Sequence, residues 1–430
     1  MKKTFHIPYG HITLPLEIEE KHLKAVLVPQ GETTSSPTIE EQAEIVLQAL
    51  DRPICSPRLQ DLAVGKQRVL IITSDHTRPM PSRITMPILL SFIRKASPNA
   101  DIRILLATGM HRPTTAEEMA EKFGPEIMQN ETILNHIASK DEEMVFKGIL
   151  PSGGELWLNS LVDWADLILS EGFIEPHFFA GFSGGRKSIL PGIASHKTVL
   201  YNHNAEFIDD PHSVQGRLTG NPLHRDMCFA AKAANLSFIL NVRLDNEKRI
   251  VAAYAGDPIK AHEAGCRDCL AKSRVKRVEG GIVITSNGGY PLDQNIYQAV
   301  KGMSTGAACV KSGGVIIMAA ECINGHGGDV FFNWFASAKN PAEVAEKIAS
   351  IPPERTLPDQ WEAQILARNL KKARCIFVTR PENEAIIKSM HMTYAPDLQS
   401  ALDIAYECAG PSAFVVVIPN GTEVVVRQSS

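Results

Sequence analysis

The sequence predicts an α/β fold with mostly parallel sheets, because short apolar segments alternate along the chain with segments of helical periodicity. The chain has 430 residues, of which 44% are hydrophobic and 21% charged, and so is long enough for two or three domains with separate cores. It contains no low-complexity segment and no internal repeat. The composition is therefore that of an ordinary globular protein.

The predicted strands are short, bounded apolar runs, namely Val69–Thr73, Ile102–Ala107, Leu167–Ser170, Ile282–Thr285, Val315–Ala319, Cys375–Val378 and Phe414–Ile418. Between them, capping boxes at Thr38–Glu41 and Thr115–Glu118 predict two helix starts, and Gly124 predicts the end of the second helix. The pair Asn221-Pro222 predicts a third helix that runs to about Asn235. The charged segment 269–281 is predicted either as a linker or as the solvated face of a helix.

Charge and cysteine usage narrow the functional class. The formal net charge is -4 and no basic block occurs, so nucleic acid is not an expected partner. Two lysines near the N-terminus precede no apolar run, and no segment approaches the roughly 18–20 apolar residues of a membrane span. The pair Cys266 and Cys269 has no second C-x-x-C partner, which argues against a zinc knuckle. We therefore expect a cytoplasmic protein with reduced, mostly buried thiols.

Polar or glycine-rich loops follow five of the predicted strands directly. In open α/β sheets, ligands bind at the carboxyl ends of the strands. The loops therefore predict one composite site, between two domains. Their sequences are SDHTRPMPSR at 74–83, TGMHRP at 108–113, EGFIEPHFFAGFSGGRK at 171–187, SNGGYPLDQN at 286–295 and AECINGHGG at 320–328.

The segment 175–203 concentrates most of the candidate chemistry. Lys187 follows Gly184 and Gly185, but an intervening arginine breaks the spacing of a phosphate-binding P-loop, so a covalent tether is the alternative. His203 lies seven residues after His196 in a predicted helix, so the two share a face and either could bind a metal whose remaining ligands come from a cofactor.

Two further histidines, His111 and His177, each lie in a loop that follows a strand. They suit an acid–base pair acting on opposite sides of a substrate, although each taken singly could be a hydrogen-bonded core histidine. Arg78 is a candidate clamp for a carboxylate, and Asp75 a candidate acceptor from a hydroxyl or ribose; alternatively the two stabilise their loop as a pair.

A helix is predicted to begin at Pro291 and to carry Gln294, Gln298 and Lys301 on one face, with Tyr297 beside it. Such a face is usually solvated. The preceding Asn-Gly-Gly loop instead favours a face that contacts a ligand.

Taken together, these motifs resemble the nickel-dependent lactate racemases. The resemblance is carried by SDHTRP at 74–79, ATGMHRP at 107–113, EPHFFAGFSGGRKSILPGIASHKT at 175–198, Asn-His at 202–203, GGYPLDQNIYQAVKGM at 288–303 and GHGG at 325–328. It spans most of the chain in the expected order. It implies two α/β domains with the active site in the inter-domain cleft, residues 1–270 forming the first and 271–430 the second, with the last residues packing back on the first.

The resemblance also implies site roles. Lys187 would bond a nickel-pincer nucleotide through a thioamide, and His203 would bind the nickel beside two sulfurs and a carbon of the cofactor. His111 and His177 would be the acid–base pair. The substrate-binding residues would be Arg78, Tyr297, Gln298, Lys301 and Trp361, and the further cofactor contacts Asp75, Thr77, Gly184 and Gly185.

The implied reaction is interconversion of D- and L-2-hydroxy acids, lactate before malate, longer 2-hydroxy acids or sugar acids. Removing the C2 proton directly would build a second negative charge beside the carboxylate. Hydride transfer to the pincer carbon, through a 2-keto acid, avoids that charge. The expected partners are the small-molecule substrate and the enzymes that synthesise the cofactor; the oligomeric state stays open. Two rivals remain: a zinc- or magnesium-dependent enzyme using the histidines as ligands, and a non-catalytic carrier of the cofactor or of a hydroxy acid.

Overall fold

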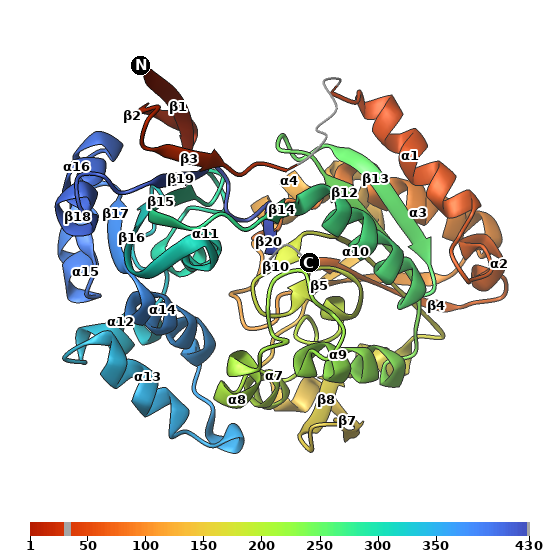
Figure 1. Cartoon of the computed structure of the whole chain (residues 1–430). Coiled ribbons are helices and arrows are strands. Elements are labelled where there is room, and N and C mark those ends of the chain that lie inside the picture. The colour runs from red at the N-terminus through yellow and green to blue at the C-terminus, as the bar shows by residue number, and fades with distance from the viewer. Residues whose placement is uncertain (30–35, 428–430) are drawn as a thin grey trace.

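The computed structural model describes residues 1–29 and 36–427 and consists of two α/β domains, each built on a six-stranded sheet (Figure 1). The first sheet has the order β13-β12-β9-β4-β5-β6, and its neighbours are parallel except for β12 and β13. Its strands are β4 (Arg68–Ser74), β5 (Asp101–Ala107), β6 (Thr132–Asn135), β9 (Leu167–Phe173), β12 (Leu236–Leu244) and β13 (Ile250–Gly256).

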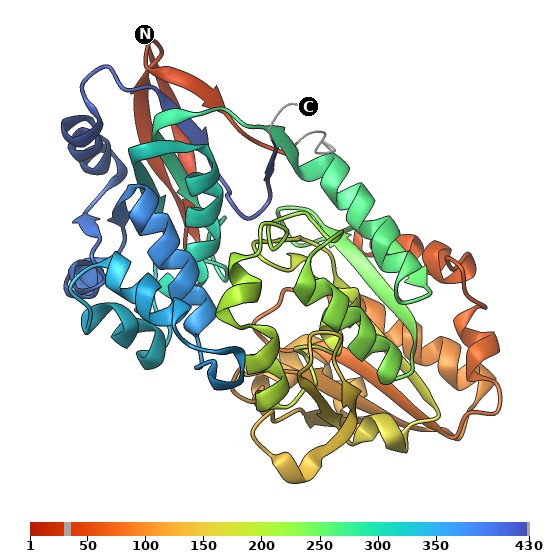
Figure 2. The ribbon, with the colours of Figure 1, turned by 60° about the horizontal axis from the view of Figure 1, so that its bottom comes forward.

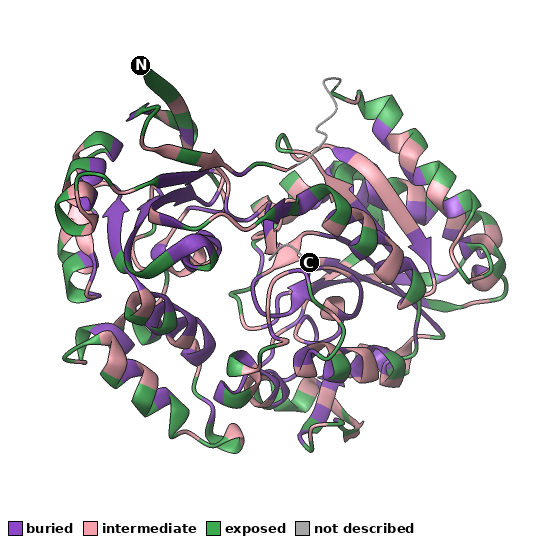
Figure 3. Ribbon diagram, in the orientation of Figure 1, coloured by how far each residue is buried: buried purple, intermediate pink, exposed green. Residues whose placement is uncertain are grey.

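Helices cover both faces of this sheet. Since alternate residues of a strand point to opposite faces, each strand contributes side chains to two cores. Val69 and Ile71 of β4 join the core formed with α1, α2 and α3, whereas Leu70 and Ile72 join the core that contains α9. The helices of this domain are α1 (Ile39–Asp51), α2 (Leu59–Ala63), α3 (Ser82–Ala96), α4 (Ala116–Phe123), α5 (Pro125–Asn130), α6 (Leu161–Trp164), α7 (His196–Asn202), α8 (Ala205–Asp209), α9 (Pro222–Ala233) and α10 (Lys260–Ser273). Figure 3 shows the central strands buried, and every residue of β9 is buried.

The second sheet is parallel throughout, in the order β18-β17-β16-β15-β19-β3. Its strands are β3 (Leu23–Val26), β15 (Gly280–Ser286), β16 (Val310–Ala319), β17 (Arg374–Val378), β18 (Thr393–Ala395) and β19 (Val415–Ile418). One face packs on α16 (Leu398–Ala409) and on the antiparallel hairpin of β1 (Lys2–Tyr9) and β2 (Ile12–Glu19). The other helices of this domain are α11 (Ile296–Cys309), α12 (Asp329–Ala336), α13 (Pro341–Ala349), α14 (Gln360–Lys372) and α15 (Glu384–Ser389).

The two ends of the chain tie the domains together. β3, near the N-terminus, pairs with β19 of the second sheet, and Figure 2 shows the red N-terminal hairpin beside the blue C-terminal helices. β14 (Arg274–Lys276) pairs with β20 (Val425–Arg427), and the Arg427 guanidinium donates to the carbonyl of Gln215 at 2.8 Å. The last described residues thus contact the first domain. The domain boundary at residue 270 stays a prediction. That prediction did not anticipate that residues 1–27 reach the second sheet, where β3 pairs with β19.

Short elements complete the chain. They are β7 (Met144–Ile149), β8 (Glu155–Asn159), β10 (Pro176–His177), β11 (Gly181–Phe182), η1 (Asp141–Glu143), η2 (Gly185–Ser188), η3 (Pro353–Arg355) and η4 (Pro381–Asn383). Within residues 1–29 and 36–427, no helix is both long and apolar enough to cross a membrane. All eight cysteines are free, and five of them are buried.

The seven predicted strands are confirmed, as are both capping boxes and the helix capped by Asn221. The predicted helix start at Pro291 is wrong. α11 begins at Ile296, because the Asn295 side chain accepts the Gln298 N–H and caps the helix there, which leaves Gln294 outside it. The segment 269–281 is neither of the predicted alternatives alone, since it holds the end of α10 and then β14.

Candidate active site

A cavity of about 600 Å³ lies between the carboxyl ends of the two sheets. His196, one of the two candidate metal ligands, does not line it. The other predicted site residues do line it, namely Asp75, Thr77, Arg78, His111, His177, Gly184, Gly185, Lys187, His203, Tyr297, Gln298, Lys301 and Trp361. A larger cavity of about 910 Å³ lies beside α9 and α10 and contains none of these residues. The convergence of titratable groups from several loops identifies the smaller, inter-domain cavity as the candidate active site.

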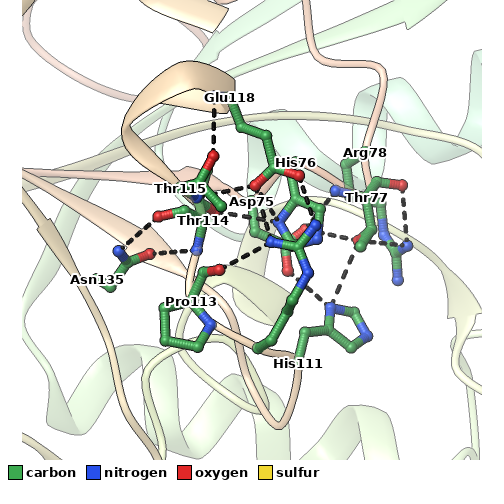
Figure 4. Close-up of polar contacts among 11 residues, drawn as sticks. Asp75, His76, Thr77, Arg78, His111, Pro113, Thr114, Thr115, Glu118 and Asn135 are labelled. Carbon is green, nitrogen blue, oxygen red and sulfur yellow. Dashed lines mark hydrogen bonds and ion pairs between the residues drawn. The ribbon is translucent and has the colours of Figure 1, made fainter. Parts of the chain in front are cut away.

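The loop after β4 and the loop after β5 meet through a carboxylate–histidine pair (Figure 4). Oδ2 of buried Asp75 lies 2.7 Å from Nδ1 of His111, and Oδ1 accepts a 2.6 Å hydrogen bond from the Thr77 hydroxyl. The Arg78 guanidinium donates to the same hydroxyl at 3.1 Å. Asp75 and Arg78 thus do organise their loop, as one sequence alternative held, yet both also line the cavity.

Asp75 is ionised in this setting. Burial alone would raise its pKa, but the hydrogen bond and charge of His111, with Arg78 and Thr77, hold the pKa of the carboxyl well below its usual range. A carboxylate can only accept hydrogen bonds, so whenever the His111 ring is neutral its proton lies on Nδ1. Nε2 of His111 is then left with a free lone pair, as a base requires.

His177 is held in the opposite way. It lies in the hairpin of β10 and β11, where its Nδ1 accepts the Ala180 N–H at 3.2 Å. The proton of the neutral ring therefore resides on Nε2, which lies 3.5 Å from Nζ of Lys187. Burial, followed by the charges of Lys187 and Lys301, keeps the pKa of His177 well below its ordinary value.

Lys187 lies in η2, where a glycine turn brings the backbone close to neighbouring side chains. Gly184 and Gly185 have φ values of 73° and 52°, which L side chains rarely adopt. A Cβ on Gly185 would lie 2.6 Å from the ring of His262. Lys187 lines the cavity, and burial, then Arg186 and Arg78, lower the pKa of its amine well below the ordinary value, which favours the neutral, nucleophilic form.

α7 begins at His196 and ends at Asn202, and His203 is its C-cap residue. The helix therefore ends one residue too early to hold both histidines on the shared face that the sequence predicted. Nδ1 of His203 lies 3.0 Å from the carbonyl of Val199, so Nδ1–H donates and Nε2 is free. Burial lowers the pKa of His203 to about 3, so the imidazole is neutral. Its ring packs against Phe179 and Trp361 at centroid distances of 5.4 and 5.0 Å.

The second domain contributes a polar wall from α11 and α14. Lys301 donates to the side-chain carbonyl of Gln298 at 2.7 Å, and the Trp361 indole donates to the Tyr297 hydroxyl at 3.0 Å. Burial and the charge of Arg78 lower the pKa of Lys301 to about 8. This wall therefore presents the Lys301 ammonium and the Gln298 amide to the loops of the first domain.

Two buried charged residues in this region were not assigned roles from the sequence. Glu362, on α14, lines the cavity, and its Oε1 has no hydrogen-bond partner among the described residues. Arg186 was noted only as a break in the P-loop spacing, yet its side chain is fully buried. Nothing in the helical pattern marks Glu362, whereas a charged residue inside a run of glycines could have marked Arg186.

Comparison with known proteins extends this description. The lactate racemase N-terminal domain family matches residues 9–216, and the lactate racemase C-terminal domain family matches residues 275–426. A lactate racemase from Thermoanaerobacterium thermosaccharolyticum is 52% identical over 422 residues, covering 98% of this chain and 99% of the relative. A lactate racemase from Lactiplantibacillus plantarum is 47% identical over 421 residues, with the same coverage of 98% and 99%.

Solved structures agree. The lactate racemase apoprotein of Thermoanaerobacterium thermosaccharolyticum superposes with a TM-score of 0.95 at 51% identity, over 99% of this chain and 100% of that one. A protein from Thermotoga maritima has a TM-score of 0.66 at 19% identity, over 91% and 98% of the two chains, and shows the fold alone. The fold, the two family matches and the full-length relatives together show that this chain belongs to the lactate racemase family of isomerases.

Proposed function

We propose that the protein interconverts D- and L-lactate by proton-coupled hydride transfer, with a nickel-pincer nucleotide tethered at Lys187 and pyruvate as the intermediate. The observation that carries the proposal is the pair His111 and His177. The two rings line one cavity, and hydrogen bonds hold them in opposite tautomers. The names of the two full-length relatives support lactate as the substrate.

The residues present fit the cofactor. Lys187 supplies an enclosed amine, and His203 supplies a neutral imidazole with Nε2 free. Across residues 1–29 and 36–427, no group of three or more His, Cys, Asp or Glu side chains could hold a metal ion. A nickel ion here would therefore need further ligands from an organic group. A pincer nucleotide supplies such ligands, whereas the rival zinc enzyme would take all its ligands from the protein.

The substrate carboxylate would lie between the domains. Arg78 offers a planar fork of donors, and Lys301 with Gln298 faces it from α11. Contacts on both sides would hold the carboxylate while C2 changes from tetrahedral to planar and back. The chemistry that the cofactor supplies when bound is reversible acceptance of hydride from C2 of the substrate.

The two histidines would manage the hydroxyl proton. Nε2 of His111, whose Nδ1–H is held by Asp75, accepts the proton of the substrate hydroxyl. His177 would donate a proton to the keto oxygen, after the intermediate has presented its other face, from its imidazolium form; the ring reaches that form by taking up a proton from water at Nδ1 in place of the Ala180 hydrogen bond. The His111 side chain is 39% exposed, so exchange with water restores the resting protonation state.

The cavity volume favours a small substrate. A space of about 600 Å³ that must also hold a mononucleotide leaves room for a short acid. Malate, longer 2-hydroxy acids and sugar acids remain second candidates that would need the same residues. We further propose a cytoplasmic enzyme, matured by the enzymes that synthesise its cofactor, since free thiols suit a reducing compartment.

The test is racemisation of D-lactate by protein produced together with the cofactor-synthesis enzymes, with nickel analysis and an absorbance spectrum of the same sample. We expect L-lactate, bound nickel and an organic chromophore. Bound nickel without lactate turnover would move the substrate to larger 2-hydroxy acids. Bound zinc without a chromophore would refute the cofactor, and binding of both cofactor and lactate without any turnover would favour a carrier.

A further inference from the structure

Arg186 is a buried cation that the proposed mechanism does not use. Its side chain is fully buried, and within the described part of the chain no ion pair joins it to a carboxylate. Burying an uncompensated charge is costly, so it persists only where hydrogen bonds satisfy it. The partners of Arg186 therefore indicate what the residue does.

Those partners belong to one loop. Nη2 donates to the Ala180 carbonyl at 2.7 Å, and Nη1 donates to the carbonyls of Phe182 at 2.7 Å and Gly184 at 3.2 Å. Nε donates to Nδ1 of His224 at 3.0 Å. Burial lowers the pKa of His224 to about 3, so this ring is neutral and can accept.

A second buried ring completes the grip. Nε2 of His262 lies 2.8 Å from the Ser183 carbonyl and donates to it. The 3.4 Å approach of Arg186 to the same nitrogen is therefore a contact between two donors and not a hydrogen bond. The backbone carbonyls of residues 180, 182, 183 and 184 thus each accept a hydrogen bond from the side chain of Arg186 or His262.

This loop joins the two reactive groups. Residues 180–184 run from the hairpin that carries His177 to the turn that carries Lys187, and Ala180 itself donates to Nδ1 of His177. Arg186, the residue before Lys187, is thus hydrogen-bonded to the hairpin that carries His177. A planar fork with five N–H groups can bond several carbonyls at once, which a lysine ammonium cannot reproduce in the same geometry.

We propose that Arg186 is a positioning residue that sets His177 and Lys187 against each other and holds His177 in its Nε2-protonated form. The inference rests on the proposed function only for the roles of these two residues.

The test uses the full chain without cofactor and needs no turnover, so its failure is distinct from failure of the proposed function. Nitrogen NMR of labelled histidines reads the tautomer of the His177 ring. In Arg186→Gln we expect the ring signals to lose the pattern of a single tautomer, because the donors that fix residues 180–184 are gone.

A second variant separates the fork from its charge. In Arg186→Lys the charge is kept but the fork is lost, so the His177 ring signals should again lose the pattern of a single tautomer. Arg243→Gln is the matched control, because Arg243 is a part-buried arginine of the same domain that binds Asp268 at 2.7 Å. It should leave the His177 signals unchanged.

Two results would overturn the proposal. One is a folded Arg186→Gln protein with unchanged His177 signals. The other is an Arg186→Lys protein with unchanged His177 signals. If Arg186→Gln does not fold, the His177 signals of Arg186→Lys decide the question alone.

Discussion

At the scale of single residues, the site depends on which nitrogen of each histidine carries the proton. Asp75 assigns Nδ1–H to His111, whereas the backbone N–H of Ala180 assigns Nε2–H to His177. A lone pair and a proton thus face one cavity without any change in the intrinsic chemistry of imidazole. The same reasoning makes Asp75 a partner of the base, beyond the cofactor contact that the resemblance implied.

Asp75→Asn tests this assignment. An amide can donate to Nδ1 of His111 and so favours the wrong tautomer, which removes the lone pair from Nε2. We expect kcat for lactate racemisation to fall by roughly 10²–10⁴, as for loss of a positioned base. Nickel content and the cofactor spectrum should stay near wild type. Asp163→Asn, an exposed residue paired with Lys147, is the control, and equal losses in both variants would contradict the role.

A buried histidine outside the site predicts the acid sensitivity of the fold. His136 is 1% exposed, and burial lowers its pKa to about 4. Its folded-state pKa lies below the unfolded value near 6.5, so the unfolded chain binds the extra proton first. The stabilisation from a neutral His136 is complete above about pH 6.5 and is lost as the pH falls towards 4.

Urea unfolding of wild type and His136→Gln at pH 7 and pH 5 measures this effect. The wild type should lose about 2 kcal/mol more than the variant between the two pH values. The variant keeps a polar group that can donate to the Ala194 carbonyl, the partner of Nε2 at 3.0 Å. Equal losses in both proteins would show that His136 is not the titrating group.

At the scale of elements, the turn from Gly184 to Lys187 is fixed by backbone conformation and close approach together. Gly185 has a positive φ, and its N–H donates to Oδ1 of Asn241 at 2.7 Å. His262 leaves no space for a Cβ at this position. The glycine pair therefore serves the packing of η2 against its neighbours, in addition to any approach of the backbone to a cofactor.

Gly185→Ala should destabilise the protein by more than the cost of its backbone conformation alone. Gly65→Ala is the matched control, because Gly65 also has a positive φ, of 74°, but no atom lies within 4 Å of its would-be Cβ. We expect the free energy of unfolding to fall by about 1–3 kcal/mol more in Gly185→Ala than in the control. Chemical denaturation of both variants gives the difference, and equal losses would mean that His262 moves aside at little cost.

At the scale of the whole molecule, the two domains contribute different halves of the site. The loops of the first domain carry Lys187, His203 and both catalytic candidates, whereas α11 of the second carries Gln298 and Lys301. A cleft with opposed walls can hold a cofactor on one side and close on a substrate from the other. The passage of β3 into the second sheet and of the last residues onto the first domain links the two walls.

Lys301→Met tests this division. Loss of the ammonium should raise KM for lactate by roughly 10–100-fold, since a charge-assisted hydrogen bond to a carboxylate contributes about 1.5–3 kcal/mol. Cofactor loading should be unaffected, because Lys187 and His203, the proposed tether and the proposed metal ligand, lie in the first domain. Steady-state kinetics and nickel analysis of the same preparation provide both values. A parallel loss of nickel would contradict the separation of the two walls.

The sequence by itself determined the α/β class, the seven central strands, three helix caps and the residues that line one cavity. These follow from local rules, because burial, capping and glycine conformation are written in short segments. Only the tertiary structure decided the rest. The start of α11 depends on which amide caps it, and the place of β3 depends on a strand almost four hundred residues away, Val415–Ile418. The tautomers of His111 and His177, and the grip of Arg186, depend on contacts between loops, and no periodicity in the sequence encodes such contacts.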